Sequence, residues 1–226
     1  MPNQQAAHTQ KNQPEENPME RMATSYDTYM KVITLGRERA LRRVTVGLAQ
    51  IQSGERILEV GCGTGTLTLA ANAQAGPAGE VYGIDAIPKM IELSRQKAAR
   101  AGVDVAFQVG NMDNLPFPAS HFDAVLGSFM IFHMPAAVRI KGIQEVYRVL
   151  KPRGRFLVLD MALPNGPIQR PVARRLFGPM LQHDLQELLS PMQEAGFADI
   201  EVGPVAYRVL GFALLGFVLG RAGKQA

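Results

Sequence analysis

The sequence predicts an open, doubly wound α/β sheet whose strands run mostly parallel, with helices on both faces. Short apolar runs alternate with longer segments of helical pattern between residues 56 and 161, and a glycine-rich turn, Gly61–Gly65, follows the first run. Such alternation is typical of parallel sheets, because each helix carries the chain back to the edge where the next strand begins. The last third of the chain supplies a further helix and two strands. We therefore expect seven strands, with an antiparallel pair at the C-terminal end.

The elements can be placed in order along the chain. Residues 1–24 are rich in Gln, Asn, Pro and Glu and lack the apolar segment of a secretion signal, so we expect a mobile tail. Residues 25–52 predict two helices over the site, separated at Gly36. Strands are then expected at 56–60, 80–84, 104–109, 122–127 and 155–161, and helices at 65–73, 88–101 and 136–149.

The region after residue 161 is expected to complete the domain. Residues 162–182 are rich in proline and glycine and contain no acid, which favours an insertion on the substrate side of the sheet. A helix is expected at 183–195, ended by Gly196, and the closing strands within 200–219. Residues 25–226 show no internal repeat and no linker, and so predict one domain. The insertion carries three arginines: Arg170, Arg174 and Arg175.

Composition excludes several kinds of protein. The chain has 226 residues, a formal net charge of +4 and one cysteine, Cys62. One cysteine cannot build a disulfide framework or a cysteine metal site, which is compatible with a reducing cytoplasm, and we expect no metal. The modest charge does not imply nucleic-acid binding. Val209–Leu219 is strongly apolar, but it is too short to span a bilayer as a helix.

The segment ILEVGCGTGTLTL, residues 57–69, carries most of the functional information. Its apolar start suits a buried strand, its glycines let the backbone turn tightly against a ligand, and its end can begin a helix. The amide groups of that first helical turn can then face the ligand. Nicotinamide enzymes place G-x-G-x-x-G at the same point, but here Thr66 stands where their third glycine would be.

The sequence E-x-G-C-G-T-G closely resembles the first motif of the class I S-adenosylmethionine-dependent methyltransferases. Further segments resemble later motifs of that family in the right order. They are VYGID at 81–85, VAFQVGNMDNLPF at 105–117, FDAVLGS at 122–128 and VYRVLKPRGRFLVL at 146–159. The resemblance implies a Rossmann-like fold, S-adenosylmethionine as cofactor and S-adenosylhomocysteine as product. The expected reaction is methyl transfer by in-line displacement, which depends mainly on positioning.

Within that family the chain most resembles the ubiquinone and menaquinone biosynthesis C-methyltransferases and their broad relatives, over most of residues 25–161. The match includes LGRERALRR, NMDNLPF and YRVLKP. It departs after the fourth strand, where S-F-M-I-F-H stands in place of an S-F-G-L-R-N-like sequence. Phe132 and His133 thus replace an arginine and an asparagine. The acceptor molecule and the acceptor atom stay open.

The motif positions indicate a set of candidate cofactor residues. Asp85 ends the second strand, where a carboxylate can accept both ribose hydroxyl protons, and its alternative role is a helix N-cap. Ile87 and Met112 would sandwich the adenine, and Asn111 would lie along its edge. Cys62 can equally be a small packing residue of the turn. The full set is Glu59, Gly61, Cys62, Gly63, Gly65, Asp85, Ala86, Ile87, Met90, Asn111, Met112 and Ser128.

Candidate acceptor residues follow the fourth strand and occupy the N-terminal helices: Tyr26, Tyr29, Phe129, Phe132 and His133. Their character favours a small hydrophobic or aromatic acceptor, although such residues can also fill the core. His133 is the candidate general base, with capping as its alternative role. The arginines and the apolar C-terminal stretch leave a peripheral membrane contact open. The oligomeric state is not predicted.

Two other functions compete with methyl transfer. The first is a nicotinamide-dependent oxidoreductase, against which Thr66 and the NMDNLPF loop argue. The second is a catalytically silent protein that binds the cofactor, or a peripheral membrane protein.

Overall fold

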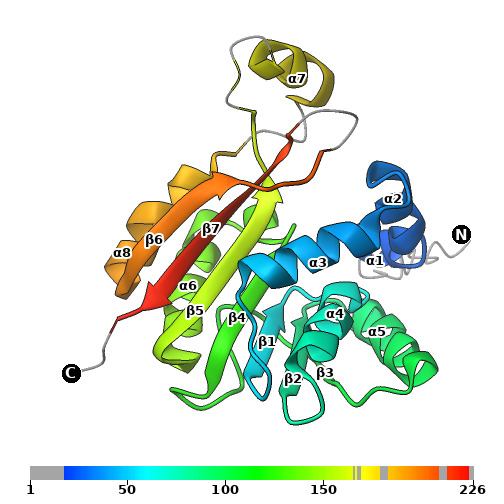
Figure 1. Ribbon diagram of the computed structural model, residues 1–226, viewed down its shortest axis with the longest axis vertical. Helices are drawn as coiled ribbons and strands as arrows, with labels where there is room; N and C mark the ends of the chain where they lie inside the picture. The colour runs from blue at the N-terminus through cyan, green and yellow to red at the C-terminus, as the bar shows by residue number, and fades with distance from the viewer. Residues whose placement is uncertain (1–17, 165, 167–168, 179–182, 209–212, 224–226) are drawn as a thin grey trace, which may run out of the picture.

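The computed structural model describes residues 18–164, 166, 169–178, 183–208 and 213–223 (Figure 1). These residues form one seven-stranded sheet in the order β3-β2-β1-β4-β5-β7-β6. The strands are β1 Arg56–Val60, β2 Glu80–Asp85, β3 Ala106–Val109, β4 Phe122–Ser128, β5 Leu150–Met161, β6 Phe197–Pro204 and β7 Leu215–Ala222. Strands β1 to β5 pair in parallel, and β7 lies antiparallel between β5 and β6. The predicted sheet is confirmed, including its antiparallel C-terminal pair.

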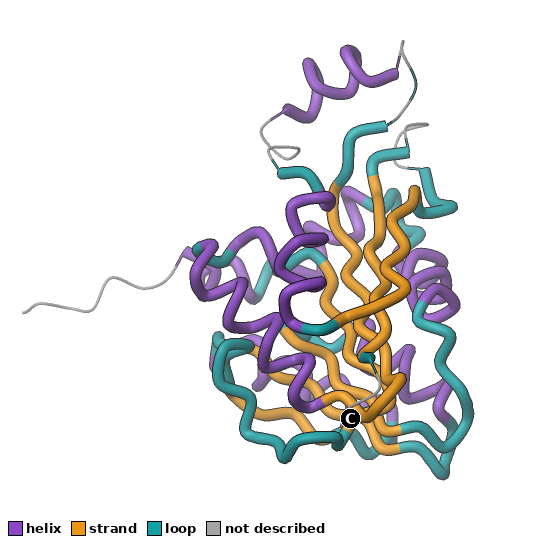
Figure 2. Tube along the Cα trace, turned by 90° about the vertical axis from the view of Figure 1, so that its left-hand side faces the viewer, coloured by secondary structure: helices purple, strands orange, loops and turns teal. Residues whose placement is uncertain are grey.

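Helices cover both faces of the sheet (Figures 1 and 2). Helices α3 Glu38–Leu48, α4 Thr66–Ala75 and α5 Pro88–Ala101 lie on one face, and α6 Ala136–Val149 and α8 Leu189–Ala195 lie on the other. Alternate strand residues point to the two faces, so that Ile57 packs with α3 and α4 while Leu58 and Val60 pack with α6. The remaining helical elements are α1 Pro18–Ala23, α2 Tyr26–Ile33, α7 Gln169–Phe177 and the 3₁₀ turns η1 Ile131–His133 and η3 Leu185–Leu188.

The order of the strands places the functional segment. The chain runs outward from β1 to β2 and β3, and then returns to the other side of β1 as β4. The connections after β1 and β4 therefore leave the sheet in opposite directions at the carboxyl ends of adjacent strands. Ligands of open α/β sheets bind at this kind of switch point.

Two sequence-based expectations need correction at their edges. Pro18–Ala23, expected to be part of a mobile tail, forms α1 with Ala23 buried, and residues 1–17 lie outside the described part. Strand β5 begins at Leu150, because Leu150 already pairs with Phe122 before Lys151-Pro152-Arg153-Gly154 bulges out and pairing resumes at Arg155. The 162–182 insertion contains α7, although residues 165, 167–168 and 179–182 are outside the described part.

The apolar C-terminal stretch is explained by the sheet. Residues 209–212 lie outside the described part, but Leu215–Ala222 forms β7, which is hydrogen-bonded to a neighbour on each side. A strand in that position is covered on both faces, so a run of apolar residues is what it requires. Within the described residues, no helix has the length and apolar character needed to cross a membrane.

Candidate functional site

The glycine turn joins β1 to α4 through backbone conformations that favour glycine. Gly61, Gly63 and Gly65 have φ angles of 64°, 52° and 78°. Their surroundings are also tight, since a Cβ at Gly61 would lie 2.8 Å from Met130 and one at Gly65 would lie 2.9 Å from Phe107. The Cys62 amide donates to the Ile84 carbonyl at 2.9 Å and so fixes the turn against the end of β2.

Asp85, the last residue of β2, is held by this turn. Its Oδ2 accepts from the Gly63 amide at 2.8 Å and its Oδ1 accepts from the Ile87 amide at 2.9 Å. Burial raises the pKa of the Asp85 carboxyl, and the two backbone hydrogen bonds oppose that rise. Each oxygen can accept a second hydrogen bond. The N-cap of α5 is Ile87, so the alternative role of Asp85 as an N-cap is wrong, and its bond to the Ile87 amide closes the turn before the helix. The carboxylate still has capacity for a ligand.

Glu59 lies beneath the turn. Its side chain is 3% exposed, and its Oε2 accepts a hydrogen bond from the Thr68 hydroxyl of α4. Burial raises the pKa of the Glu59 carboxyl to about 7, and the Thr68 hydrogen bond and the Arg42 charge oppose this rise. Glu59 therefore fastens α4 to β1. This contact gives Glu59 a positioning role, and its expected contact with the cofactor stays a prediction.

Three other predicted cofactor residues turn their side chains into the core. Cys62, Met90 and Met112 are 6%, 2% and 4% exposed. Cys62 packs with Phe107, and burial raises the pKa of its thiol. Met112 fills the space beside Gly142, where an added Cβ would lie 2.9 Å from Met112 Cγ. The Met112 side chain is thus packed in the core, and its contact with the adenine stays a prediction. Ile87 is half-buried, and Ala86 and Asn111 are exposed.

A first polar clasp, formed by Glu38, Arg42, Thr66 and Ser128, ties α3 to the turn and to β4. Thr66 Oγ1 donates to Glu38 Oε1 at 2.9 Å, and Glu38 pairs with Arg42 at 3.2 Å. Arg42 Nη1 donates to Ser128 Oγ at 3.3 Å. Arg42 is buried, and its Nε has no hydrogen-bond partner among the described residues. A buried donor without a partner is costly, so this N–H is a candidate group for holding an acceptor.

A second polar clasp, formed by Asp27, Thr64 and Lys97, ties α2 to the turn and to α5. Thr64 Oγ1 donates to Asp27 Oδ1 at 2.6 Å, and Lys97 Nζ lies 2.8 Å from Asp27 Oδ2 and 2.9 Å from Thr64 Oγ1. The Lys97 ammonium and the Thr64 hydroxyl bond outweigh desolvation and lower the pKa of Asp27. The two clasps together hold the N-terminal helices against the glycine turn.

The two predicted tyrosines are placed differently by these clasps. Cε1 of Tyr26 would lie 3.7 Å from a Cβ at Gly63, and burial raises the pKa of the Tyr26 phenol to about 12. The charges that act on this phenol are those of Arg42, Glu59, Glu38 and Asp85. Tyr26 therefore lies beside the glycine turn, on the side of the site expected to hold the methyl donor. Tyr29 packs at 6.5 Å from the Tyr26 ring centroid and is 40% exposed.

The predicted acceptor residues after β4 follow a strained turn. Phe129 has a φ of 55° and packs beside Leu41 and Leu159. Phe132 stacks on His183 with ring centroids 4.8 Å apart, and the Arg139 guanidinium lies 5.1 Å from the Phe132 ring centroid. His133 ends η1 and is exposed. Phe129 and Phe132 therefore pack against different apolar clusters, and His133 is the exposed end of the loop between β4 and α6.

Sequence reasoning missed several polar residues of this region. Glu38 and Arg42 have the i, i+4 spacing of a helical ion pair, which is a usable signal, although the arginines of this helix read as a solvated face. Asp160 carries no sequence signal beyond its place in the strand expected at 155–161. It is 9% exposed at the carboxyl end of β5, and burial raises the pKa of its carboxyl to about 6.

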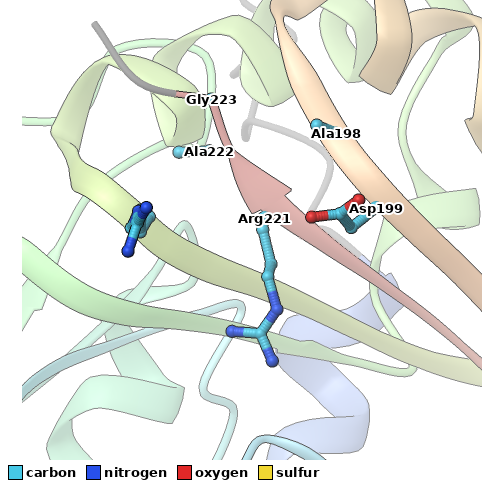
Figure 3. A pocket seen from close by; sticks show the side chains of 6 residues that line it. Ala198, Asp199, Arg221, Ala222 and Gly223 are labelled. Carbon is cyan, nitrogen blue, oxygen red and sulfur yellow. The ribbon is translucent and has the colours of Figure 1, made fainter.

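A hollow of about 450 Å³ lies elsewhere, at the amino end of β5 (Figure 3). It is lined by Arg153, Ala198, Asp199, Arg221, Ala222 and Gly223. Arg221 donates from this position to Gln50 Oε1 at 2.7 Å. Because the glycine turn and Asp85 lie at the carboxyl ends of the strands, this hollow is not the candidate cofactor site.

Comparisons with known proteins identify the family of the chain. A family model described as a methyltransferase domain matches residues 57–154. A demethylmenaquinone methyltransferase of Lactiplantibacillus plantarum is 31% identical over 204 residues, which cover 79% of this chain and 85% of that protein. Another, of Symbiobacterium thermophilum, is 35% identical over 147 residues, or 64% of this chain and 58% of that protein. The match thus spans less than two thirds of the second relative's length.

Solved structures share the fold. A SAM-dependent methyltransferase of Aquifex aeolicus superposes with a TM-score of 0.68 at 18% identity, covering 89% of this chain and 97% of that one. The family model and the curated relatives above are methyltransferases, so the nicotinamide alternative is not favoured.

Glu59 should make the free energy of unfolding of the protein depend on pH. Its folded-state pKa of about 7 lies above the ordinary value of 4.5, so its stabilising contribution is fully present below pH 4.5 and is lost as the pH rises through 7. Relative to Glu59→Gln, which keeps an acceptor for Thr68, the wild type should lose about 3 kcal/mol of unfolding free energy across that window. Urea unfolding of both proteins between pH 4 and pH 8, roughly the range that brackets both values, measures this.

Glu201→Gln, at an exposed carboxyl of β6, is the matched control and should run parallel to the wild type. Parallel curves for Glu59→Gln as well would show that Glu59 does not titrate in this range.

Proposed function

Because the chain belongs to the class I S-adenosylmethionine-dependent methyltransferases, in the group of the ubiquinone and menaquinone biosynthesis C-methyltransferases, we propose that it methylates a small hydrophobic or aromatic acceptor. The observation that carries this proposal is the pairing of two unsatisfied groups beside the glycine turn. Asp85 offers free acceptor capacity, and Arg42 offers a buried N–H without a partner among the described residues. A ligand that brings hydroxyl donors to one and a carboxylate to the other would complete both.

The residues present fit S-adenosylmethionine. The ribose hydroxyls would donate to Asp85, and the carboxylate of the methionine part would accept from Arg42 and lie beside Ser128. Gly61 and Gly63 would let the cofactor come close to the backbone of the turn. Ile87 would cover one face of the adenine. Asn111 and the backbone of Met112 would lie along its edge. When bound, the cofactor supplies an electrophilic methyl group on a sulfonium.

The contribution of the chain is positioning and exclusion of water. The two polar clasps hold α2 and α3 over the turn, and Tyr26 covers Gly63 with a phenol that stays neutral. Holding two reactants at near-attack distance can replace several kcal/mol of activation free energy, on the order of 7–11 kcal/mol in well-oriented systems. No nucleophilic residue is required for such a displacement.

The acceptor would lie near the aromatic residues that follow β4. Phe132 stacks on His183 beside Arg139, and Phe129 packs with the apolar cluster around Leu41. The apolar and aromatic character of this loop favours a planar ring, and the relatives named above act on a demethylmenaquinone by their names. We assign a quinol-like or phenolic ring as the acceptor class. His133 stays the candidate base at the outer end of the loop.

Loss of the ribose acceptor should weaken cofactor binding strongly. Asp85→Ala removes two charge-assisted hydrogen bonds and should weaken S-adenosylhomocysteine binding by about 3 kcal/mol, or roughly 100-fold in Kd. Titration calorimetry measures the Kd. Asp104→Ala, at an exposed carboxylate, is the control and should leave the Kd unchanged. Equal affinities for Asp85→Ala and wild type would rule out this assignment.

Arg42 can be tested by comparing two ligands. Arg42→Met should weaken S-adenosylhomocysteine binding by about 2 kcal/mol, on the order of 30-fold, because a charge-assisted contact to the carboxylate is lost. It should leave 5′-methylthioadenosine, which has no carboxylate, within about 3-fold of wild type. Arg39→Met on the exposed side of α3 should change neither. A parallel loss for both ligands would instead indicate a purely structural role.

The acceptor class is tested by release of S-adenosylhomocysteine across hydrophobic quinols, phenols, amines, thiols and sugars. Turnover is expected with quinols or phenols, and the Asp85→Ala variant should show none. Turnover confined to amines, thiols or sugars would contradict the proposed acceptor while leaving methyl transfer intact.

A further inference from the structure

Helix α7 stands apart from the body of the molecule. Figures 1 and 2 show it beyond the carboxyl end of β5, at the far end of the long axis from the C-terminus. Within the helix, Gln169–Phe177, the buried residue is Ala173, which packs with Leu214. The other described side chains of α7 are exposed or half-buried. The helix therefore adds almost nothing to the core.

The exposed surface of α7 is both apolar and basic. Val172 and Leu176 are 42% and 62% exposed, and their spacing of four residues places them on one face of the helix. Arg170, Arg174 and Arg175 are exposed around them, and none of the ion pairs between described residues uses them. Residues 162–183 contain no Asp or Glu. We call Arg170, Val172, Arg174, Arg175 and Leu176 the α7 patch.

Two large aliphatic side chains held in water beside three arginines form the pattern of a helix that lies at a lipid interface. The aliphatic groups enter the region below the headgroups, and the guanidinium groups meet anionic lipid phosphates. The three arginines, with no acid in residues 162–183, make an anionic surface the complementary partner. Val32 and Leu35 at the end of α2, also highly exposed at 67% and 59%, give a second apolar patch on the protein.

We propose that the α7 patch docks the protein on an anionic lipid surface. The α7 patch takes the place of the apolar C-terminal stretch as the element of membrane contact, because residues 215–219 of that stretch lie in β7 within the sheet. The proposal stands on exposure and charge and does not require the acceptor to be a quinol. If the acceptor is lipid-soluble, the patch would also bring the site close to its source.

The test is co-sedimentation of the full chain with vesicles of phosphatidylcholine alone or mixed with phosphatidylglycerol. Wild type should bind the mixed vesicles and bind neutral vesicles at least about 10-fold more weakly. Replacing Arg170, Arg174 and Arg175 together by Gln should lower the partition coefficient about 100-fold. The matched control replaces Arg43, Arg100 and Arg153, three exposed arginines elsewhere, by Gln and should lower it less than about 5-fold.

A second variant separates the apolar contribution. Val172→Ser with Leu176→Ser should weaken binding even at high salt, where the arginine contribution is screened. S-adenosylhomocysteine affinity is measured for every variant and should be unchanged, which distinguishes loss of docking from misfolding or from failure of the proposed function. The proposal is overturned if wild type ignores anionic vesicles, or if the α7 and control arginine variants bind equally well.

Discussion

The hydrogen bond from the Gly63 amide to the Asp85 carboxylate is the contact on which the site depends. It joins the turn after β1 to the end of β2, so the two neighbouring parallel strands present their ends as one unit. The bond requires a positive φ at Gly63, and the same turn brings Met130 and Phe107 within 3 Å of the places that side chains would occupy at Gly61 and Gly65. Backbone conformation, packing and charge therefore all constrain the five residues of the turn, Gly61–Gly65.

The cover over that turn is held in a different way. Helix α3 is anchored by buried apolar side chains such as Leu41 and Val46, but its contact with the turn runs through Glu38, Arg42 and Thr66. Helix α2 is joined through Asp27 to Thr64 and Lys97, with Asp27 partly exposed. Met30 of α2 is also buried, at 2% exposed. Water competes for exposed polar contacts far better than for apolar ones, so the contacts of Asp27 are the weaker part of the attachment of α2.

Local signals made most of the fold predictable. Strand and helix limits around the glycine turn agree with those expected to within about two residues, because turn residues and apolar periodicity act over short distances. The direction of single side chains did not follow from such signals. Met112 points into the core because Gly142 leaves room for it, and Arg42 reaches Ser128, which lies 86 positions later. The burial of the C-terminal stretch likewise depends on β7 pairing with both β5 and β6. Each of these facts is set by a distant partner.

The charges beneath the turn bear on what the site can hold. Glu59 and Asp85 both have raised pKa values because burial disfavours their ionised forms, and Arg42 offsets part of that cost for Glu59. A second positive charge brought near them would favour both carboxylates. Under the proposed assignment the sulfonium of S-adenosylmethionine carries such a charge, whereas S-adenosylhomocysteine, the product, has a neutral sulfur. Binding and ionisation are linked in both directions, so the cationic cofactor should be held more tightly relative to its product when these carboxyls are deprotonated. Under the same assignment, the carboxyls whose ionised forms burial disfavours would thereby favour release of the neutral product.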